Sequence, residues 1–246
     1  MSTLDTMFRH VNVLQNDPTS TIELVGDWLN ELGVSYRIHR LYNDEFPDSI
    51  GDGVIVLGGR PSANQDDAYP FLVKERLLLR HLVDDDVPIF GICLGMQLLT
   101  LACGGTMDIR SARGVESGPV NITWRASAFT SPVLSSLAHA FPDGCTVSAD
   151  HADGIETPPE GAQILAESDR YIHAIRVGSA LAVQFHPEAG PTRMRVWEKS
   201  RGVTPESLVN NWLAQREERI KIGRLLTESF VCQDELACAA EQTRSA

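Results

Sequence analysis

The sequence has no apolar run long enough to cross a membrane and no cluster of basic residues. A membrane-spanning helix needs about 20 consecutive apolar residues, and no stretch of the 246 residues approaches that length. The first residues, MSTLDTMFRHVNVL, lack the basic-then-apolar order of a secretory signal. The formal net charge is −12, whereas binding to nucleic-acid phosphates needs clustered Lys and Arg. We therefore predict a cytoplasmic protein that binds neither membranes nor nucleic acids.

Cysteine is scarce and irregularly placed. The five cysteines are odd in number and lack the spacing to histidines that zinc sites show, and disulfide frameworks are rare in a reducing cytosol. The sequence also has no Gly-x-x-x-x-Gly-Lys-Ser/Thr loop for nucleotide phosphates. We expect no metal and no organic cofactor, so a catalytic cysteine has to be identified from its own surroundings.

The first half of the chain has the strand–helix alternation of an α/β protein. Continuous apolar runs are typical of strands buried on both faces, as in parallel sheets covered by helices. Apolar residues at helical spacing predict helices over 22–32, which Gly33 ends, and over 69–83. Strands are predicted at 11–14, 35–39, 53–57 and 89–92.

The second half changes to shorter strands and then to helices. The segment 205–231 has an apolar face among many charges, and such a helix either packs on its own domain or contacts a partner. We place one domain at 1–196 and a C-terminal helical extension at 197–246. The shorter strands are predicted at 120–124, 145–149, 162–167, 171–177 and 180–185.

The stretch Gly91-Ile92-Cys93-Leu94-Gly95 joins a buried strand to an apolar helix. A nucleophile at such a turn has a strained backbone, and small residues on either side let the chain pass close to itself. The helix N-terminus favours a thiolate, and the Leu94 amide would face an oxyanion formed on a substrate at Cys93. Gln97 lies on the same helix face. For this stretch alone, a buried core thiol is the alternative.

Two further stretches supply partners for the cysteine. In Val183–Glu188, an apolar strand delivers His186 to its C-terminal end, Pro187 forces a turn, and Glu188 can orient the imidazole. In VLGG at 56–59, two glycines after a buried strand permit an exposed backbone amide, the second donor that an oxyanion hole needs. Each stretch alone is more often structural, and their combination with Cys93 favours a catalytic site.

Together these stretches resemble the class I glutamine amidotransferases. The resemblance is carried by GICLGMQLL at 91–99, VQFHPE at 183–188 and VLGG at 56–59, and it covers roughly residues 9–190. It implies a flavodoxin-like three-layer α/β/α fold with a mostly parallel central sheet, to which this chain adds its C-terminal helical extension.

The resemblance implies hydrolysis of the side-chain amide of glutamine. Cys93 would attack the amide carbonyl, and His186 would take the thiol proton and later protonate the departing ammonia. Glu188 would orient His186, and the amides of Gly59 and Leu94 would stabilise the oxyanion. Water would then release glutamate from a γ-glutamyl thioester.

Substrate contacts are expected at Gly58 and Gln97, and at Asp150 and His151 in the loop SADHADG. This loop resembles one that carries His-Gly-Asp near the substrate in the glutaminase part of GMP synthase. Here Ala152 replaces the glycine and excludes any conformation that only glycine tolerates. A solvated polar turn is the alternative interpretation of the loop.

Two other positions depart from the family pattern. Arg60 separates the Gly-Gly turn from Pro61, and its guanidinium is expected either to pair with a substrate carboxylate or to face solvent. His173 stands where relatives frequently have glutamine.

Three functions remain open at this point. The chain can be the glutaminase component of a two-protein amidotransferase that passes ammonia to a separate synthase, which we prefer because the family that it resembles includes synthase-coupled forms. It can be an autonomous hydrolase of γ-glutamyl compounds. A binding or regulatory protein with an idle site is the third alternative, and the intact cysteine, histidine and glutamate argue against it.

Overall fold

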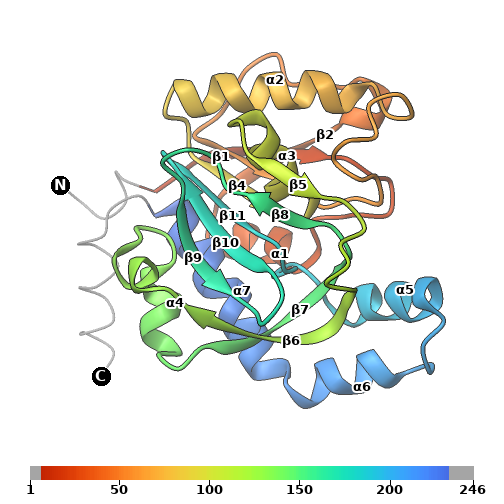
Figure 1. The fold of residues 1–246 in the computed structure, drawn as a ribbon. Coiled ribbons are helices and arrows are strands. Elements are labelled where there is room, and N and C mark those ends of the chain that lie inside the picture. The colour runs from red at the N-terminus through yellow and green to blue at the C-terminus, as the bar shows by residue number, and fades with distance from the viewer. Residues whose placement is uncertain (1–6, 233–246) are drawn as a thin grey trace, which may run out of the picture.

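The computed structural model describes residues 7–232, and a nine-stranded sheet forms its centre (Figure 1). The strands are β1 (His10–Gln15), β2 (Ser35–Arg40), β3 (Gly53–Val56), β4 (Ile89–Ile92), β6 (Glu116–Trp124), β7 (Cys145–His151), β9 (Gln163–Glu167), β10 (Ile172–Val177) and β11 (Ala180–Val183). Their order is β2-β1-β3-β4-β11-β10-β9-β6-β7. The first five of these are parallel, and the others extend the sheet in antiparallel pairs.

Each predicted strand is present, although two end earlier than expected. The strand predicted at 53–57 ends at Val56. The strand predicted at 180–185 stops at Val183, because the chain then leaves β4 and the His186 amide donates to the Ser148 carbonyl of β7. Two short strands that the sequence did not reveal, β5 (Thr106–Asp108) and β8 (Gly154–Thr157), form a separate antiparallel ribbon.

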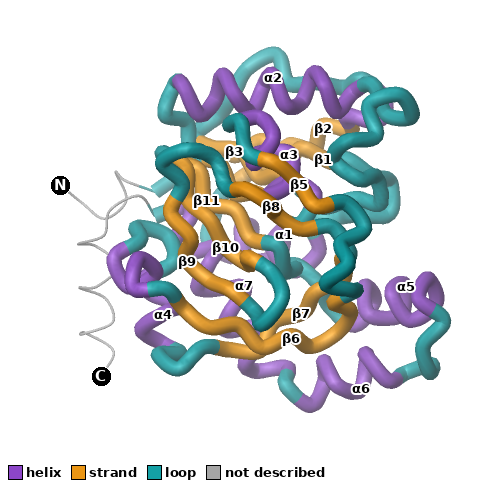
Figure 2. The backbone as a smooth tube through the Cα atoms, in the orientation of Figure 1, coloured by secondary structure: helices purple, strands orange, loops and turns teal. Residues whose placement is uncertain are grey.

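Helices cover both faces of the sheet, so the molecule has three layers (Figure 2). Along β3, Ile55 points into one layer, whereas Val54 and Val56 point into the other, as the pleat of a strand requires. The prediction of a flavodoxin-like three-layer fold is confirmed. One face carries α1 (Glu23–Glu31), α4 (Ser135–Ala140) and α7 (Arg216–Val231), and the other carries α2 (Phe71–Asp84) and α3 (Leu94–Ala102).

Helix α1 shows how the sequence determines where a helix forms and where it ends. Val25, Trp28 and Leu29 lie at helical spacing, and all three are buried against the sheet. Gly33 follows the helix with a φ of 73°, a left-handed conformation that glycine adopts without strain, and the chain turns there into β2.

The C-terminal helices are continuous with the rest of the molecule. The boundary placed at 196/197 falls inside α5 (Pro191–Arg201), which is followed by α6 (Ser207–Ala214) and α7. Phe230 of α7 packs edge-on against Phe8, with ring centroids 5.4 Å apart, and belongs to the same core cluster as α1. The helices thus pack on the parent domain, whereas residues 233–246 of the predicted extension lie outside the described residues.

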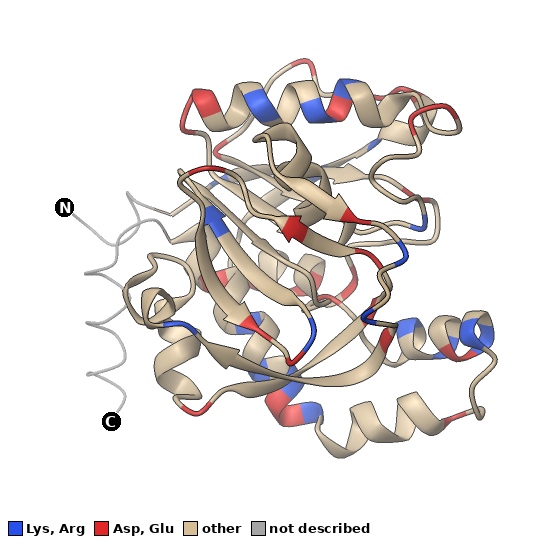
Figure 3. Ribbon diagram, in the orientation of Figure 1, with Lys and Arg blue, Asp and Glu red and all other residues tan. Residues whose placement is uncertain are grey.

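Charges of both signs are interspersed along α2 and α7 (Figure 3). Within residues 7–232, no helix combines the length and the apolar character that a membrane crossing requires.

Candidate active site

Cys93 lies at the turn between β4 and α3 in a conformation that residues other than glycine rarely adopt. Its φ is 51° and its ψ is −104°, so this turn has the strained backbone that was expected. The Cys93 amide donates to the Val183 carbonyl of β11 at 2.8 Å. The thiol therefore lies at the carboxyl edge of the parallel strands, where ligands bind in α/β sheets.

At Gly91 and Gly95, on either side of Cys93, the neighbouring atoms leave too little room for a side chain. A Cβ on Gly91 would lie 3.1 Å from the Ala182 Cβ, and a Cβ on Gly95 would collide with the carbonyl oxygen of Val56. The chain passes this close to its neighbours only because both side chains are absent.

His186 follows β11 and lies beside Cys93. A Cβ on Gly58 would lie 3.1 Å from the His186 Cε1 and 3.5 Å from the Cys93 Cβ, so Gly58 leaves the space that both side chains occupy. His186 Nδ1 donates to Glu188 Oε1 at 2.7 Å. Trp197 of α5 packs edge-on against the imidazole at a centroid distance of 5.0 Å. The cysteine, histidine and glutamate therefore form one connected group.

The electrostatics of this group favour a charged imidazole. Burial by itself lowers the pKa of His186, but the negative charges of Glu188 and of the Cys93 thiolate outweigh burial and raise the pKa of His186 well above its ordinary value. An imidazolium beside a thiolate is the charge state that nucleophilic attack by a cysteine requires.

Leu94 and Gly59, whose amides are the expected oxyanion donors, lie close to each other near Cys93. Leu94 is the first residue of α3, where the amides have no partner within the helix. A Cβ on Gly59 would lie 2.9 Å from the Leu94 Cδ2, so these two residues are in close contact. The arrangement can offer two amide donors to a developing negative oxygen.

A pair of buried glutamines lies behind the nucleophile. Gln97 Nε2 donates to Gln184 Oε1 at 3.4 Å, and Gln184 Nε2 donates to the Cys93 sulfur at 3.4 Å. The contact between Gln184 and Cys93 was missed from the sequence. The sequence feature that could have indicated this contact is the amide side chain of Gln184 at the end of an otherwise apolar strand.

A cavity of about 410 Å³ opens over this group. Seven of the nine predicted site residues line it, whereas Gly58 and Leu94 lie next to lining residues. Helix α5 adds Arg193, Trp197 and Arg201, which sequence reasoning did not assign to the site. Arg201 donates to Asp150 at 2.9 Å. The seven are Gly59, Cys93, Gln97, Asp150, His151, His186 and Glu188.

The loop after β7 is not the solvated polar turn that was considered as an alternative. His151 is 4% exposed and Asp153 is 9% exposed. The Asp153 carboxylate accepts the Arg110 amide at 2.8 Å, while its backbone carbonyl lies 3.0 Å from His151 Nδ1. The His151 ring is thus engaged within the fold, and Asp150 is the more accessible group of the expected pair.

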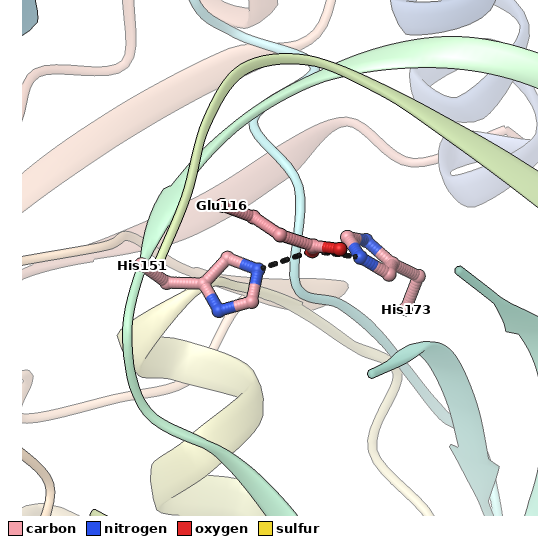
Figure 4. Close-up of side chains that lie close together, drawn as sticks. All are labelled: Glu116, His151 and His173. Atoms are coloured by element: carbon pink, nitrogen blue, oxygen red, sulfur yellow. Dashed lines mark hydrogen bonds and ion pairs between the residues drawn. The ribbon is translucent and has the colours of Figure 1, made fainter. Parts of the chain in front are cut away.

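The other ring nitrogen of His151 joins a buried network that the sequence did not reveal (Figure 4). Glu116 Oε2 lies 3.1 Å from His151 Nε2 and 2.7 Å from His173 Nε2, and Glu116 Oε1 accepts from the Ser168 hydroxyl at 2.8 Å. Burial tends to raise the pKa of Glu116, but these hydrogen bonds outweigh it and hold the pKa far below the usual range. Glu116 therefore ties the cavity loop to β6 and β10.

The same three side chains are residue types that bind transition metals, and their ligand atoms lie within 4.8 Å of one another. Each imidazole Nε2 lies at hydrogen-bond distance from the carboxylate of Glu116. A cation would have to replace both of these hydrogen bonds. The distances between the three side chains are those of hydrogen bonds.

The family is decided by comparison with known proteins. The sequence model of the class-I glutamine amidotransferase family matches residues 15–197. The chain belongs to this family. This membership agrees with the resemblance of the motifs around Cys93 and His186.

GMP synthases and a γ-glutamyl peptidase are among the similar sequences. The chain is 34% identical over 173 residues to a GMP synthase of Bdellovibrio bacteriovorus, covering 69% of this chain but 30% of that relative. It is 32% identical over 189 residues to a GMP synthase subunit of Haloquadratum walsbyi, covering 74% of this chain and 91% of the relative. It is also 32% identical over 170 residues to γ-glutamyl peptidase 5 of Arabidopsis thaliana, covering 64% of this chain and 63% of the relative.

Solved structures share the fold. A glutamine amidotransferase from Thermotoga maritima matches with a TM-score of 0.80 at 23% identity, covering 90% of this chain and 97% of that one. A second, from Methylobacillus flagellatus, has a TM-score of 0.80 at 20% identity and covers 92% and 95% of the two chains.

The two residues that depart from the family pattern, Arg60 and His173, both have side-chain partners within the protein. Arg60 is 73% exposed at the cavity, and its Nε donates to Asp17 Oδ2 at 2.7 Å, so the guanidinium pairs with a carboxylate of the protein itself. His173 is fully buried and is held by Glu116.

Replacing Glu116 tests the buried network. We expect Glu116→Ala to lower the free energy of unfolding by about 3 kcal/mol or more, because each buried donor left without an acceptor costs about 1–3 kcal/mol. Glu116→Gln should cost less, since its amide oxygen still accepts from the histidines. Urea denaturation measures both changes. Equal stability of the alanine variant and the wild type would contradict the network.

Proposed function

We propose that the protein is a glutaminase that hydrolyses the side-chain amide of glutamine through a cysteinyl thioester and supplies ammonia to a separate synthase. The observation that carries the proposal is Cys93 at a positive φ beside a histidine that is hydrogen-bonded to Glu188. A side chain held in a strained turn next to an oriented base is the arrangement of an activated nucleophile.

The chemistry proceeds in two halves. The Cys93 thiolate attacks the γ-carbonyl, and the amides of Gly59 and Leu94 stabilise the tetrahedral oxyanion. The imidazolium of His186 protonates the departing ammonia, and the γ-glutamyl thioester remains. His186, now neutral, takes a proton from water, which attacks the thioester and releases glutamate. Glu188 keeps the imidazole oriented through both halves.

Substrate binding is assigned to the rim and floor of the cavity. Gln97 lies on the floor and Gly58 leaves room for the reacting groups. Asp150, held by Arg201, offers a carboxylate that suits the α-ammonium group of glutamine. His151 acts by fixing this loop.

A γ-glutamyl hydrolase that works alone is the second candidate. The similarity to a γ-glutamyl peptidase favours it, and a cavity of about 410 Å³ lies in the size range of sites for larger ligands. The similarity to the GMP synthase subunit of Haloquadratum walsbyi, over 91% of that relative, favours the synthase-coupled glutaminase.

A substrate comparison separates the two candidates. We expect the purified chain to release glutamate slowly from glutamine and faster when the cognate synthase is added. Glutamate release is measured by coupled glutamate dehydrogenase, with γ-glutamyl dipeptides as alternative substrates. High turnover of dipeptides with none of glutamine would overturn the first proposal in favour of the second.

A further inference from the structure

Four arginines line the cavity that opens over Cys93, and three of them form ion pairs with carboxylates of the protein. The fourth, Arg110, is exposed, and its guanidinium has neither a hydrogen bond nor an ion pair with any other residue of 7–232. Such a guanidinium can bind an anionic group of a ligand without first breaking a bond within the protein. The three pairs are Arg60–Asp17 at 2.7 Å, Arg193–Glu23 at 2.7 Å and Arg201–Asp150 at 2.9 Å.

The carboxylates of the cavity wall each have a donor other than the Arg110 guanidinium. Of the three that line the cavity in the described part of the chain, two are bound by His186 and Arg201. The third, Asp153, accepts the backbone amide of Arg110 at 2.8 Å. The positive charge of the Arg110 side chain is therefore left for a group that enters the cavity.

The backbone of Arg110 is fixed against the segment that carries Asp150. Its φ is 50°, in the left-handed region that residues other than glycine seldom adopt. The Asp153 carboxylate holds this conformation through the Arg110 amide, and the Ser111 amide donates to the Ala152 carbonyl at 3.0 Å. Residues held in such conformations are concentrated at ligand-binding sites. These bonds place Arg110 and Asp150 on adjoining segments of the cavity wall.

We propose that the Arg110 guanidinium binds the α-carboxylate of the γ-glutamyl substrate. Asp150 is assigned to the α-ammonium group, and both groups are bonded to the same carbon, so their protein partners have to lie on neighbouring segments. Arg110 and Asp150 meet this condition and line the same cavity as Cys93. A planar guanidinium forms two parallel hydrogen bonds with a carboxylate. The inference rests on the proposed function, because the substrate has to be glutamine or another γ-glutamyl compound.

A substrate without the α-carboxylate tests this assignment. 4-Aminobutanamide is glutamine that lacks this group, and its hydrolysis is followed by ammonia release. We expect Arg110→Gln to raise the KM for glutamine by about 10- to 100-fold with kcat nearly unchanged, because the lost hydrogen bonds stabilise ground state and transition state alike. For 4-aminobutanamide, the wild type and Arg110→Gln should have nearly equal kcat/KM. The preference for glutamine over 4-aminobutanamide should thus fall by about tenfold or more.

Two further variants sharpen the comparison. Arg110→Lys keeps the charge but not the two parallel donors, so its KM for glutamine should lie between those of the wild type and Arg110→Gln. Arg37→Gln is the matched control, because Arg37 is an exposed arginine of β2 that does not line the cavity, and it should keep the wild-type KM. If 4-aminobutanamide is hydrolysed too slowly for a rate, its inhibition constant against glutamine takes the place of kcat/KM.

The possible failures are distinguishable. An unchanged KM for glutamine in Arg110→Gln would overturn the assignment of Arg110, and so would equal losses on glutamine and 4-aminobutanamide. A wild type that hydrolyses γ-glutamyl dipeptides but not glutamine would overturn the proposed glutaminase, and the dipeptides, which carry the same α-carboxylate, would then replace glutamine in the comparison. A wild type that hydrolyses neither would overturn the proposed function and this inference with it.

Discussion

Cys93→Ser is expected to abolish glutamate release, with a rate reduced about a thousandfold or more. The serine hydroxyl fits the same strained turn, so the fold is retained. However, a hydroxyl is far less acidic than a thiol, and the neighbouring His186–Glu188 pair cannot generate comparable amounts of its anion. Coupled detection of glutamate measures the loss, and mass spectrometry should detect a γ-glutamyl adduct on the wild type alone.

Cys103→Ser is the matched control for this substitution. Cys103 ends α3, and burial raises the pKa of its thiol, which leaves it unreactive. This variant should retain the wild-type rate. If Cys93→Ser keeps more than about a tenth of the activity, the nucleophile assignment is wrong, because removal of a nucleophile costs orders of magnitude.

His186→Ala is expected to be nearly as damaging, because both half-reactions need a proton carrier at this position. Glu188→Gln should be about 10- to 100-fold less damaging than His186→Ala, since an orienting group contributes less than the base itself. The exposed His139 of α4 supplies a control, and His139→Ala should leave the rate unchanged. Equal rates for the wild type and His186→Ala would exclude the assigned role.

The pH dependence of glutamate release tests how Glu188 changes the pKa of His186. The raised pKa of His186 keeps the imidazole protonated beyond its ordinary range, and activity is lost when pH rises through this pKa. Glu188→Gln removes a negative charge that raises the pKa of His186, so the alkaline limb should move to lower pH. An unchanged alkaline limb would show that Glu188 does not set the charge of His186.

The sequence motifs, taken together with the family resemblance that they carry, were sufficient to predict a candidate catalytic group, and the structure brings its members Cys93, His186 and Glu188 together. Gly-Ile-Cys-Leu-Gly specifies a strained turn wherever a strand enters a helix, and His-Pro-Glu places a carboxylate beside an imidazole within three residues. The strands that deliver Cys93 and His186 are continuous apolar runs, and these are recognised without knowledge of their partners. The fold class and the candidate nucleophile, base and orienting acid were therefore accessible from the chain alone.

The residues that surround and hold the candidate catalytic group could not be predicted from local sequence patterns. Glu116 and His173 are 57 residues apart in the sequence and meet because β6 and β10 both pair with β9. Gln184 reaches Cys93 across 91 residues. Such contacts depend on sheet order and register, which local patterns do not encode.

The sequence by itself determined the α/β architecture and the identity of the candidate nucleophile and its base, because apolar periodicity and glycine-flanked turns act over a few residues. Only the tertiary structure decided what surrounds them. It decided between the two interpretations of the loop at 150–153 by burying His151, which Glu116 holds, and it brought α5 to the cavity. The physical reason is that burial and long-range pairing, which set the protonation and orientation of these groups, exist only once the sheet has assembled.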